Sequence, residues 1–415
     1  MMKSAIISAL LASTAANAAP LADPAMEAKA LAIHERVMAV DTHVDIPVTF
    51  MTVAMDPGGL TTDQVDLPKM RAGGLDAPFF IDYTAQGPLT DEGYAAAKAN
   101  SDLKLAAIHR LVGAYPDQIA LAASSKEARA IAKSGRKVAF IGMENPFPLG
   151  PAPVQADIDA LAAAGVSYCS ITHFGHNQFG DSANPSEELG DAEEKWGGLS
   201  PEGEKLVAML NRAGVMVDVS HAGKKTMMQA VALSKAPIIA SHSSVTALAD
   251  TPRNLDDEQL RALAANGGVA QIVAVDVYLK PYTDEQIAVR DKVRKDMGLD
   301  TEEARETMTP DVKAEYEKRL APMWAISPRA SVSDLVDGVD HAVKIAGVDH
   351  VGISSDFDGG GGIEGWDDAS ETLNVTRELV KRGYSETDIT KIWGGNLLRV
   401  LDAVQKKSAE LKRAG

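Results

Sequence analysis

Seven side chains that could bind a metal ion or transfer a proton fall at the ends of apolar runs. They are His43, Asp45, Glu144, His173, His221, His242 and Asp356. Imidazole nitrogens and carboxylate oxygens, without any thiolate, are a ligand set that suits catalytic zinc and leaves coordination positions open for water. If these side chains meet in the folded chain, the chemistry they predict is metal-assisted hydrolysis.

The spacing within this set indicates how the ligands would be shared. His43 and Asp45 are two residues apart, so on a strand their side chains point to the same side and suit one ion. His221 and His242, from neighbouring strands, suit a second ion, and Glu144 could bridge the two. Two ions about 3.5–4 Å apart can hold a hydroxide between them and stabilise an oxyanion.

Each of these residues also has a structural interpretation. A lone histidine at a strand end is usually structural, a glutamate after a strand often lies at a helix N-terminus, and Asp356 could cap the glycine-rich turn that follows it. The joint pattern favours a metal site, because so many polar groups at one end of a fold are costly without a shared partner. We interpret four other histidines as structural or surface groups and leave His176 undecided: His34, His109, His341 and His350.

Eight apolar runs, separated by Ala/Leu-rich stretches with helical spacing, must position these groups. Such runs suit a parallel sheet covered on both faces, and a (β/α)₈ TIM barrel is the simplest architecture with eight strands. In a barrel the C-terminal strand ends converge on one face, where catalytic groups collect. A doubly wound open sheet is the alternative, weakened because no glycine-rich nucleotide-binding motif follows a strand. The runs are 37–43, 77–83, 137–144, 167–173, 215–221, 237–243, 268–275 and 350–356.

Two segments interrupt this alternation. Residues 46–76 form a long connection, and residues 276–328 form a charged insertion before the last strand that we predict as two helices. Both would leave from C-terminal strand ends, which makes both candidates for lids or active-site walls. For 276–328, a solvated helical hairpin is the favoured interpretation over a substrate-contacting role.

Composition narrows the class of protein. The chain has 415 residues, a net charge of −17 and ordinary hydrophobic content, and we expect residues 19–415 to form one domain. An acidic surface disfavours nucleic acid as a partner. Cys169 is the only cysteine, which excludes an internal disulfide and Cys-rich zinc sites. We expect no membrane anchor, since no later segment has the length and purity of a membrane-spanning helix.

The N-terminus has the features of a signal peptide over residues 1–18. Lys3 provides the positive charge, residues 5–16 an apolar stretch, and Ala16-Asn17-Ala18 a cleavage site. We therefore expect a periplasmic or secreted protein.

The same residues carry a family resemblance. The segments DTHVDIP, GMEN, ITHFGHN, DVSHAG, ASHSS, PRNLDDE and GISSDFDG occur in the order and approximate spacing of the membrane (renal) dipeptidase family. This family comprises zinc metallopeptidases of the amidohydrolase-like barrel superfamily, and the resemblance extends over about residues 37–403. Each segment alone is a weak signal, but the ordered set is highly specific.

The resemblance implies a role for each matching residue. His43 and Asp45 resemble the ligands of a first Zn²⁺, Glu144 the bridging carboxylate, and His221 with His242 the ligands of a second Zn²⁺. Asp356 resembles the acid–base carboxylate and His173 the group that polarises the scissile carbonyl. Arg253 resembles the group that binds the free substrate carboxylate, and Tyr83 stands where the family often has a substrate contact. Asn254 and Asp358 match motifs without an assigned role.

The implied activity is hydrolysis of small dipeptides, including L-D dipeptides, by a metal-bridging hydroxide, and a homodimer is compatible with it. One departure lies after Glu144, where Asn145-Pro146-Phe147 replaces the Gly-Gly of many members and should alter the substrate wall. Two alternatives stay open. The first is another two-metal amidohydrolase, which is disfavoured because such enzymes commonly bridge their metals with a carbamylated lysine at the strand end where this chain has Glu144. The second is a non-peptidase periplasmic maturation or binding protein that keeps the same site.

Overall fold

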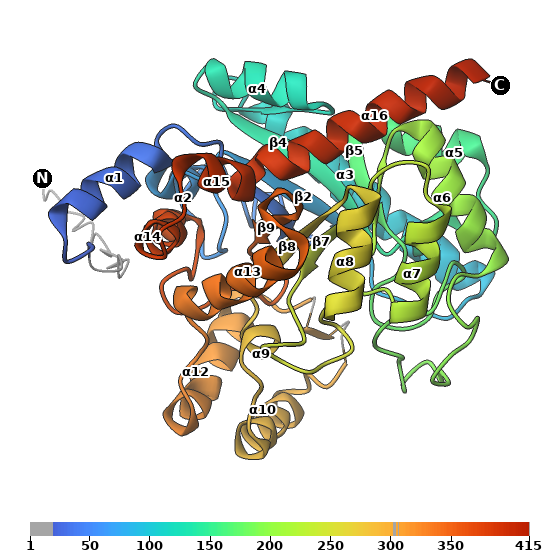
Figure 1. Cartoon of the computed structure of the whole chain (residues 1–415). Helices are drawn as coiled ribbons and strands as arrows, with labels where there is room; N and C mark the ends of the chain where they lie inside the picture. The colour runs from blue at the N-terminus through green and yellow to red at the C-terminus, as the bar shows by residue number, and fades with distance from the viewer. Residues whose placement is uncertain (1–19, 302–303, 306, 415) are drawn as a thin grey trace, which may run out of the picture.

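The computed structural model describes residues 20–301, 304–305 and 307–414 (Figure 1). The expected signal peptide at residues 1–18 lies outside the described residues. Among the residues that are described, no helix is both long enough and apolar enough to cross a membrane.

Eight parallel strands form the barrel that the sequence predicts. Each strand pairs with the next around the barrel, and a parallel bridge between Val44 and Phe357 closes it, with the Asp45 amide donating to the Phe357 carbonyl at 2.9 Å. A short extra strand, β3 (Ile119–Leu121), pairs with the start of β4 outside the barrel and was not predicted. The barrel strands are β1 (Val40–Asp45), β2 (Ala77–Tyr83), β4 (Lys137–Glu144), β5 (Val166–Ser170), β6 (Met216–Asp218), β7 (Ile239–Ser243), β8 (Val269–Val273) and β9 (Val351–Ser354).

Helices surround the barrel, with α16 crossing one end of it and α5 to α8 along one flank (Figure 1). Local sequence sets their ends: Ser200 caps α6 before Pro201, and Gly214 ends it in the left-handed region. The outer helices are α1 (Pro24–His34), α2 (Leu67–Gly73), α3 (Asp91–Ala114), α4 (Ser125–Lys133), α5 (Gln155–Ala163), α6 (Pro201–Ala213), α7 (Lys224–Leu233), α8 (Asp257–Asn266), α13 (Val332–Ala346), α14 (Leu373–Lys381), α15 (Glu386–Thr390) and α16 (Asn396–Ala414).

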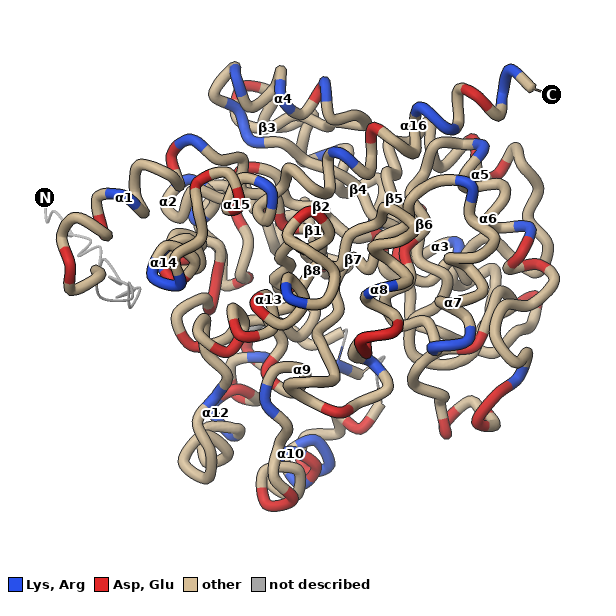
Figure 2. Tube along the Cα trace, viewed as in Figure 1, with Lys and Arg blue, Asp and Glu red and all other residues tan. Residues whose placement is uncertain are grey.

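The insertion between β8 and α13 is helical, as predicted. Its described residues include α9 (Asp276–Leu279), α10 (Asp284–Met297) and α12 (Pro310–Ile326), where two helices were expected. The pair α10 and α12 projects away from the barrel (Figure 1), and acidic and basic residues are interspersed along both (Figure 2).

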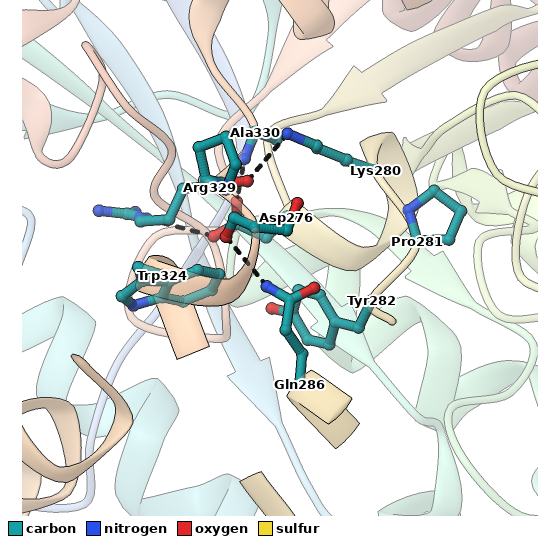
Figure 3. A pocket seen from close by; sticks show the side chains of 10 residues that line it. Asp276, Lys280, Pro281, Tyr282, Gln286, Trp324, Arg329 and Ala330 are labelled. Atoms are coloured by element: carbon teal, nitrogen blue, oxygen red, sulfur yellow. Dashed lines mark hydrogen bonds and ion pairs between the residues drawn. The ribbon is translucent and has the colours of Figure 1, made fainter. Parts of the chain in front are cut away.

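Polar contacts fasten the two ends of this insertion to each other (Figure 3). The Asp276 carboxylate accepts the Ala330 amide at 2.5 Å and the Arg329 Nε–H at 3.3 Å. Lys280 donates to the Pro328 carbonyl at 3.0 Å. These contacts hold the first and last residues of the insertion together, which limits how far α10 and α12 can move from the barrel.

A buried histidine of α1 ties this helix to α2 and α14 and yields a pH prediction. His34 Nε2 donates to the Gly73 carbonyl, while Nδ1 accepts from Thr376 Oγ1, both at 2.8 Å. Trp393 Nε1 donates to the same hydroxyl at 2.8 Å. The Thr376 hydroxyl proton is therefore committed to His34, and burial lowers the pKa of His34 below its ordinary value of 6.5. This agrees with the structural role expected from the sequence.

We expect this site to make the protein less stable in acid. Above the ordinary pKa both states are neutral; below it the unfolded chain binds a proton that the folded chain resists, so the free energy of unfolding falls. His34→Gln should reduce the pH dependence of the free energy of unfolding by up to about 1.4 kcal/mol per pH unit. Urea denaturation of both proteins between about pH 7.5 and 5.5 measures the difference, and parallel stability curves would contradict it.

Candidate metal centre

The C-terminal strand ends bring all seven predicted groups to one mouth of the barrel. His43 and Asp45 lie on β1, Glu144 ends β4, and His242 lies on β7. The other three lie two or three residues past a strand end: His173 after β5, His221 after β6 and Asp356 after β9. All are buried except Asp45, which is partly exposed. The strand ends therefore gather the residues that the sequence analysis grouped together.

Glu144 lies between two sets of imidazoles. Its Oε1 is 3.2 Å from both His221 Nε2 and His242 Nε2, and its Oε2 is 3.3 Å from His43 Nε2. The two Nε2 atoms of His221 and His242 are 2.9 Å apart. Asp45 and Asp356 complete the first set, with carboxylate oxygens 3.6 Å and 3.7 Å from His43 Nε2. One carboxylate is thus shared by two groups of ligands.

These separations fit divalent cations. Ligand atoms about 2.1 Å from one zinc at tetrahedral angles are roughly 3.4 Å from one another, close to the spacing around Glu144. Among the described residues, His43 Nε2 and Glu144 Oε1 are buried without a hydrogen-bond partner. Buried polar atoms without partners are costly, and two ions, one on each side of Glu144, would satisfy these.

The charges in the cluster are strongly coupled. Although burial disfavours its charged form, the carboxylates of Glu144 and Asp45 hold the pKa of His43 well above the ordinary value. Burial likewise opposes the ionisation of Glu144, yet the neighbouring imidazoles hold its pKa well below the usual range. Burial lowers the pKa of His221 and of His242 well below 6.5. His221 and His242 therefore have the neutral form that metal binding requires, beside an ionised Glu144, whereas His43 keeps a proton that an incoming metal ion would have to displace.

Asp356 differs from Glu144 in this respect. Burial, opposed by His43 and reinforced by the charges of Asp45 and Glu144, raises the pKa of Asp356 to about 8. A buried carboxyl with a raised pKa can hold and release a proton near neutral pH. The two carboxyls therefore differ in the direction of their pKa shifts, although Asp356 also lies with His43 and His242 in a group of atoms that could hold a metal ion.

Backbone strain is concentrated at the same mouth. Non-glycine residues with positive φ include Asn145 (59°), His221 (65°) and Asp356 (59°), each a member of the cluster or adjacent to it. Such conformations cost about 1–3 kcal/mol each and are typical of functional sites. Asn145, at the departure from Gly-Gly noted above, keeps the left-handed turn and donates through Nδ2 to the Thr84 carbonyl at 2.9 Å.

The three predicted substrate-binding residues lie around this cluster. The ring of His173 is 4.2 Å from that of His221, and the Tyr83 ring packs edge-on against His173 with centroids 4.6 Å apart. Arg253 is buried, donates to Ser243 Oγ at 2.7 Å and to the His242 carbonyl, and lies over the Tyr278 ring. Its Nε has no hydrogen-bond partner among the described residues.

The unassigned motif residues and His176 have structural contacts. Asp358 accepts the Gln64 amide at 3.0 Å and pairs with Lys313 of α12 at 3.2 Å, so it ties the insertion to the loop that carries Asp356. Asn254 donates to the Tyr278 carbonyl at 2.9 Å. His176 binds the Ser182 amide and the Ala192 carbonyl within its own loop, which resolves it as structural.

Sequence reasoning missed the polar residues that support the ligands from behind. Three buried residues are involved. The Tyr168 hydroxyl bonds to His43, the Ser241 hydroxyl bonds to His242, and Asp218 accepts a hydrogen bond from Ser241. The available signal was an aspartate inside an apolar run, as in VMVDVSH, because a buried carboxylate needs partners. The identity of those partners required the register between strands.

Comparison with known proteins agrees with this geometry. The family model described as membrane dipeptidase (Peptidase family M19) matches residues 27–415. Dipeptidase verJ of Clonostachys rogersoniana is 30% identical over 402 residues, which cover 93% of this chain and 89% of that protein. The residues matched by the family model therefore span every residue of the cluster.

Solved structures show the same fold. The probable dipeptidase PvdM from Pseudomonas aeruginosa superimposes with a TM-score of 0.81 at 34% identity, covering 92% of this chain and 99% of that one. A metallo peptidase from Rhodobacter sphaeroides, liganded with a phosphinate mimic of L-Ala-D-Ala, superimposes with a TM-score of 0.65 at 22% identity, covering 89% and 99%.

Proposed function

The chain belongs to the membrane dipeptidase family, Peptidase family M19, and from this premise we propose that it is a dipeptidase that uses two zinc ions. The observation that carries the proposal is the position of Glu144, whose two oxygens face separate groups of ligands. A structural ion pair would need only one such group.

His43 and Asp45 would hold the first ion, His221 and His242 the second, and Glu144 both. When bound, two such ions polarise a carbonyl oxygen and lower the pKa of a water they share, so that a nucleophile forms at neutral pH. With only nitrogen and oxygen ligands, the set suits zinc and keeps positions open for water and substrate.

The remaining residues would bind the substrate and move its proton. Arg253 has a planar guanidinium, which suits the free carboxylate at the C-terminal end of a dipeptide. His173 would donate to the scissile carbonyl oxygen. Asp356 would accept the proton of the attacking water and deliver it to the departing amine, a role that its raised pKa favours.

The test of this proposal is hydrolysis of a dipeptide panel with and without a chelator. The panel includes L-L and L-D pairs together with tripeptides and N-acetylated amino acids. We expect hydrolysis of dipeptides alone, loss of activity after chelation and recovery on adding zinc. Hydrolysis of N-acetylated amino acids instead would support another amidohydrolase activity, and no hydrolysis by the zinc-loaded protein would contradict the proposal.

Replacing Arg253 should affect substrate binding more than turnover. A hydrogen bond to a charged group is worth about 1.5–3 kcal/mol, so Arg253→Met should raise KM by about 10–100-fold. A dipeptide with a C-terminal amide is the matched control, since it lacks the charge that Arg253 would bind. The wild type should strongly prefer the free acid and the variant should not; an unchanged preference would exclude the assigned role.

We also propose that the protein is exported, on the strength of the signal-like segment at residues 1–18. Sequencing the N-terminus of protein recovered from the periplasm or medium tests this. Cleavage after Ala18 is expected, and a retained N-terminal segment on protein found only in the cytoplasm would contradict it.

A further inference from the structure

A buried chain of hydrogen bonds connects one imidazole of the cluster to a carboxylate behind it. His242 Nδ1 lies 2.8 Å from Ser241 Oγ, and Ser241 Oγ donates to Asp218 Oδ2 at 2.6 Å. The other carboxylate oxygen, Oδ1, accepts the amides of Ser220 at 3.0 Å and Ser241 at 2.8 Å. Asp218 and Ser241 are fully buried, so water does not compete for these bonds.

The direction of these hydrogen bonds determines which ring nitrogen of His242 carries the proton. An ionised carboxylate only accepts hydrogen bonds, so the Ser241 hydroxyl proton points to Asp218. The Ser241 oxygen must then accept from His242, which requires the proton to be on Nδ1. His242 Nε2, the atom 3.2 Å from Glu144 Oε1, is left with its lone pair directed into the cluster.

The Nδ1 atom of His43 also has a hydrogen-bond partner behind it, but this partner is a tyrosine hydroxyl. Its Nδ1 lies 2.9 Å from the Tyr168 hydroxyl, and that hydroxyl donates its own proton to the Thr42 carbonyl at 3.1 Å. Because the Tyr168 proton is donated to Thr42, the hydroxyl oxygen accepts from the Nδ1–H of His43, and Tyr168 lies on β5, which is not adjacent to β1 in the barrel. The unpaired Nε2 again faces Glu144.

His221 provides an internal contrast. Its Nδ1 is buried and has no hydrogen-bond partner among the described residues. Its backbone is instead held in the left-handed region at φ 65°. Two of the three imidazoles around Glu144 are thus fixed by hydrogen bonds from behind, whereas the His221 ring is held by its backbone conformation and by packing against the rings of His173 and Phe174.

We propose that Asp218, acting through Ser241, and Tyr168 are positioning residues that keep a proton on Nδ1 of His242 and of His43, so that each ring directs Nε2 to a metal ion. The metal-binding part of this inference rests on the proposed function. Partners of this kind typically change metal affinity by about 10–100-fold when they are removed.

Asp218→Asn is the sharpest test, because it keeps the size of the side chain and reverses the chain of bonds. Oδ1 of the asparagine would keep the two amide bonds, and its NH₂ group would donate to Ser241 Oγ. The Ser241 proton would then turn to His242 Nδ1 and move the imidazole proton to Nε2, the metal-facing atom. Tautomer errors of this kind arise when an aspartate behind a catalytic histidine becomes asparagine.

The experiment has two readouts. The first is ¹⁵N NMR of the metal-free protein with labelled histidine at about pH 8, where an unperturbed imidazole is neutral. We expect the Nδ1–H tautomer of His242 in the wild type and the Nε2–H tautomer in Asp218→Asn. The second is zinc titration against a competing chelator, in which one of two ions should bind about 10–100-fold more weakly in the variant.

Three further variants separate positioning from folding. Asp66→Asn alters a buried aspartate that caps α2, and it should leave both zinc constants unchanged. Should Asp218→Asn fail to fold, Ser241→Ala breaks the same chain without adding a donor, and it should weaken one zinc ion. Tyr168→Phe should likewise weaken one ion through His43.

An Nε2–H tautomer of His242 in the wild type would overturn the inference. So would zinc constants in Asp218→Asn or Ser241→Ala that equal those of the wild type. A wild type that binds no zinc would contradict the proposed function, and the NMR readout distinguishes that case because it needs no metal.

Discussion

Glu144→Ala is expected to abolish paired metal binding and to lower dipeptide turnover by about 10³-fold or more. The Glu144 carboxylate lies within 3.3 Å of three imidazoles, those of His43, His221 and His242. Without it, each ion would lose a charged ligand and the two would repel each other across an unscreened gap. A catalytic ion contributes several kcal/mol, and each 1.4 kcal/mol is a factor of ten in rate. Elemental analysis and steady-state kinetics measure both effects.

Glu144→Gln separates charge from volume at this position. The amide keeps the shape but has one acceptor oxygen in place of two, so zinc content should fall below two per chain here as well. Glu371→Gln is the control, since Glu371 is also buried but accepts the Asp367 amide, away from the cluster. Full zinc content and normal turnover in Glu144→Gln would rule out a bridging role.

Asp356→Asn should separate proton transfer from metal binding. General acid–base catalysis contributes about 10²–10⁴-fold, so kcat should fall by that factor while zinc content stays near two. We expect this because the pKa of Asp356 is raised to about 8, so that Asp356 can carry a proton near neutral pH while Glu144 stays ionised. Kinetics and metal analysis on the same sample provide the comparison.

Asp349→Asn is a matched control near the same strand. Asp349 precedes β9, at the opposite end from Asp356, and pairs with Lys391 at 2.6 Å. Its replacement should leave kcat unchanged. Wild-type turnover in Asp356→Asn, or loss of zinc together with activity, would exclude the role of Asp356 as the proton carrier.

The barrel and the composition of the cluster could be predicted because both follow from local patterns. Apolar runs separated by helical spacing predict buried parallel strands, and polar residues at run ends predict a shared face. His43, Glu144 and His242 were selected on that basis, and the structure brings their side chains together. Their roles as ligands stay predictions until metal binding is measured.

What the sequence could not predict depends on register and on contacts between distant segments. The bond between Asp218 and Ser241 requires β6 to lie beside β7 with Asp218 opposite Ile239. The bond between Tyr168 and His43 joins residues 125 positions apart. The strand β3 has only three residues, too few for a periodic signal. The pairing of Lys313 with Asp358 depends on how the insertion folds back over the barrel.

Anomalous diffraction at the zinc edge from crystals of the zinc-loaded protein tests the central claim most directly. Two peaks about 3.5–4 Å apart are expected, one beside His43 and Asp45, the other beside His221 and His242, with Glu144 between them. No peak at the barrel mouth, or a single peak that does not involve Glu144, would contradict the account.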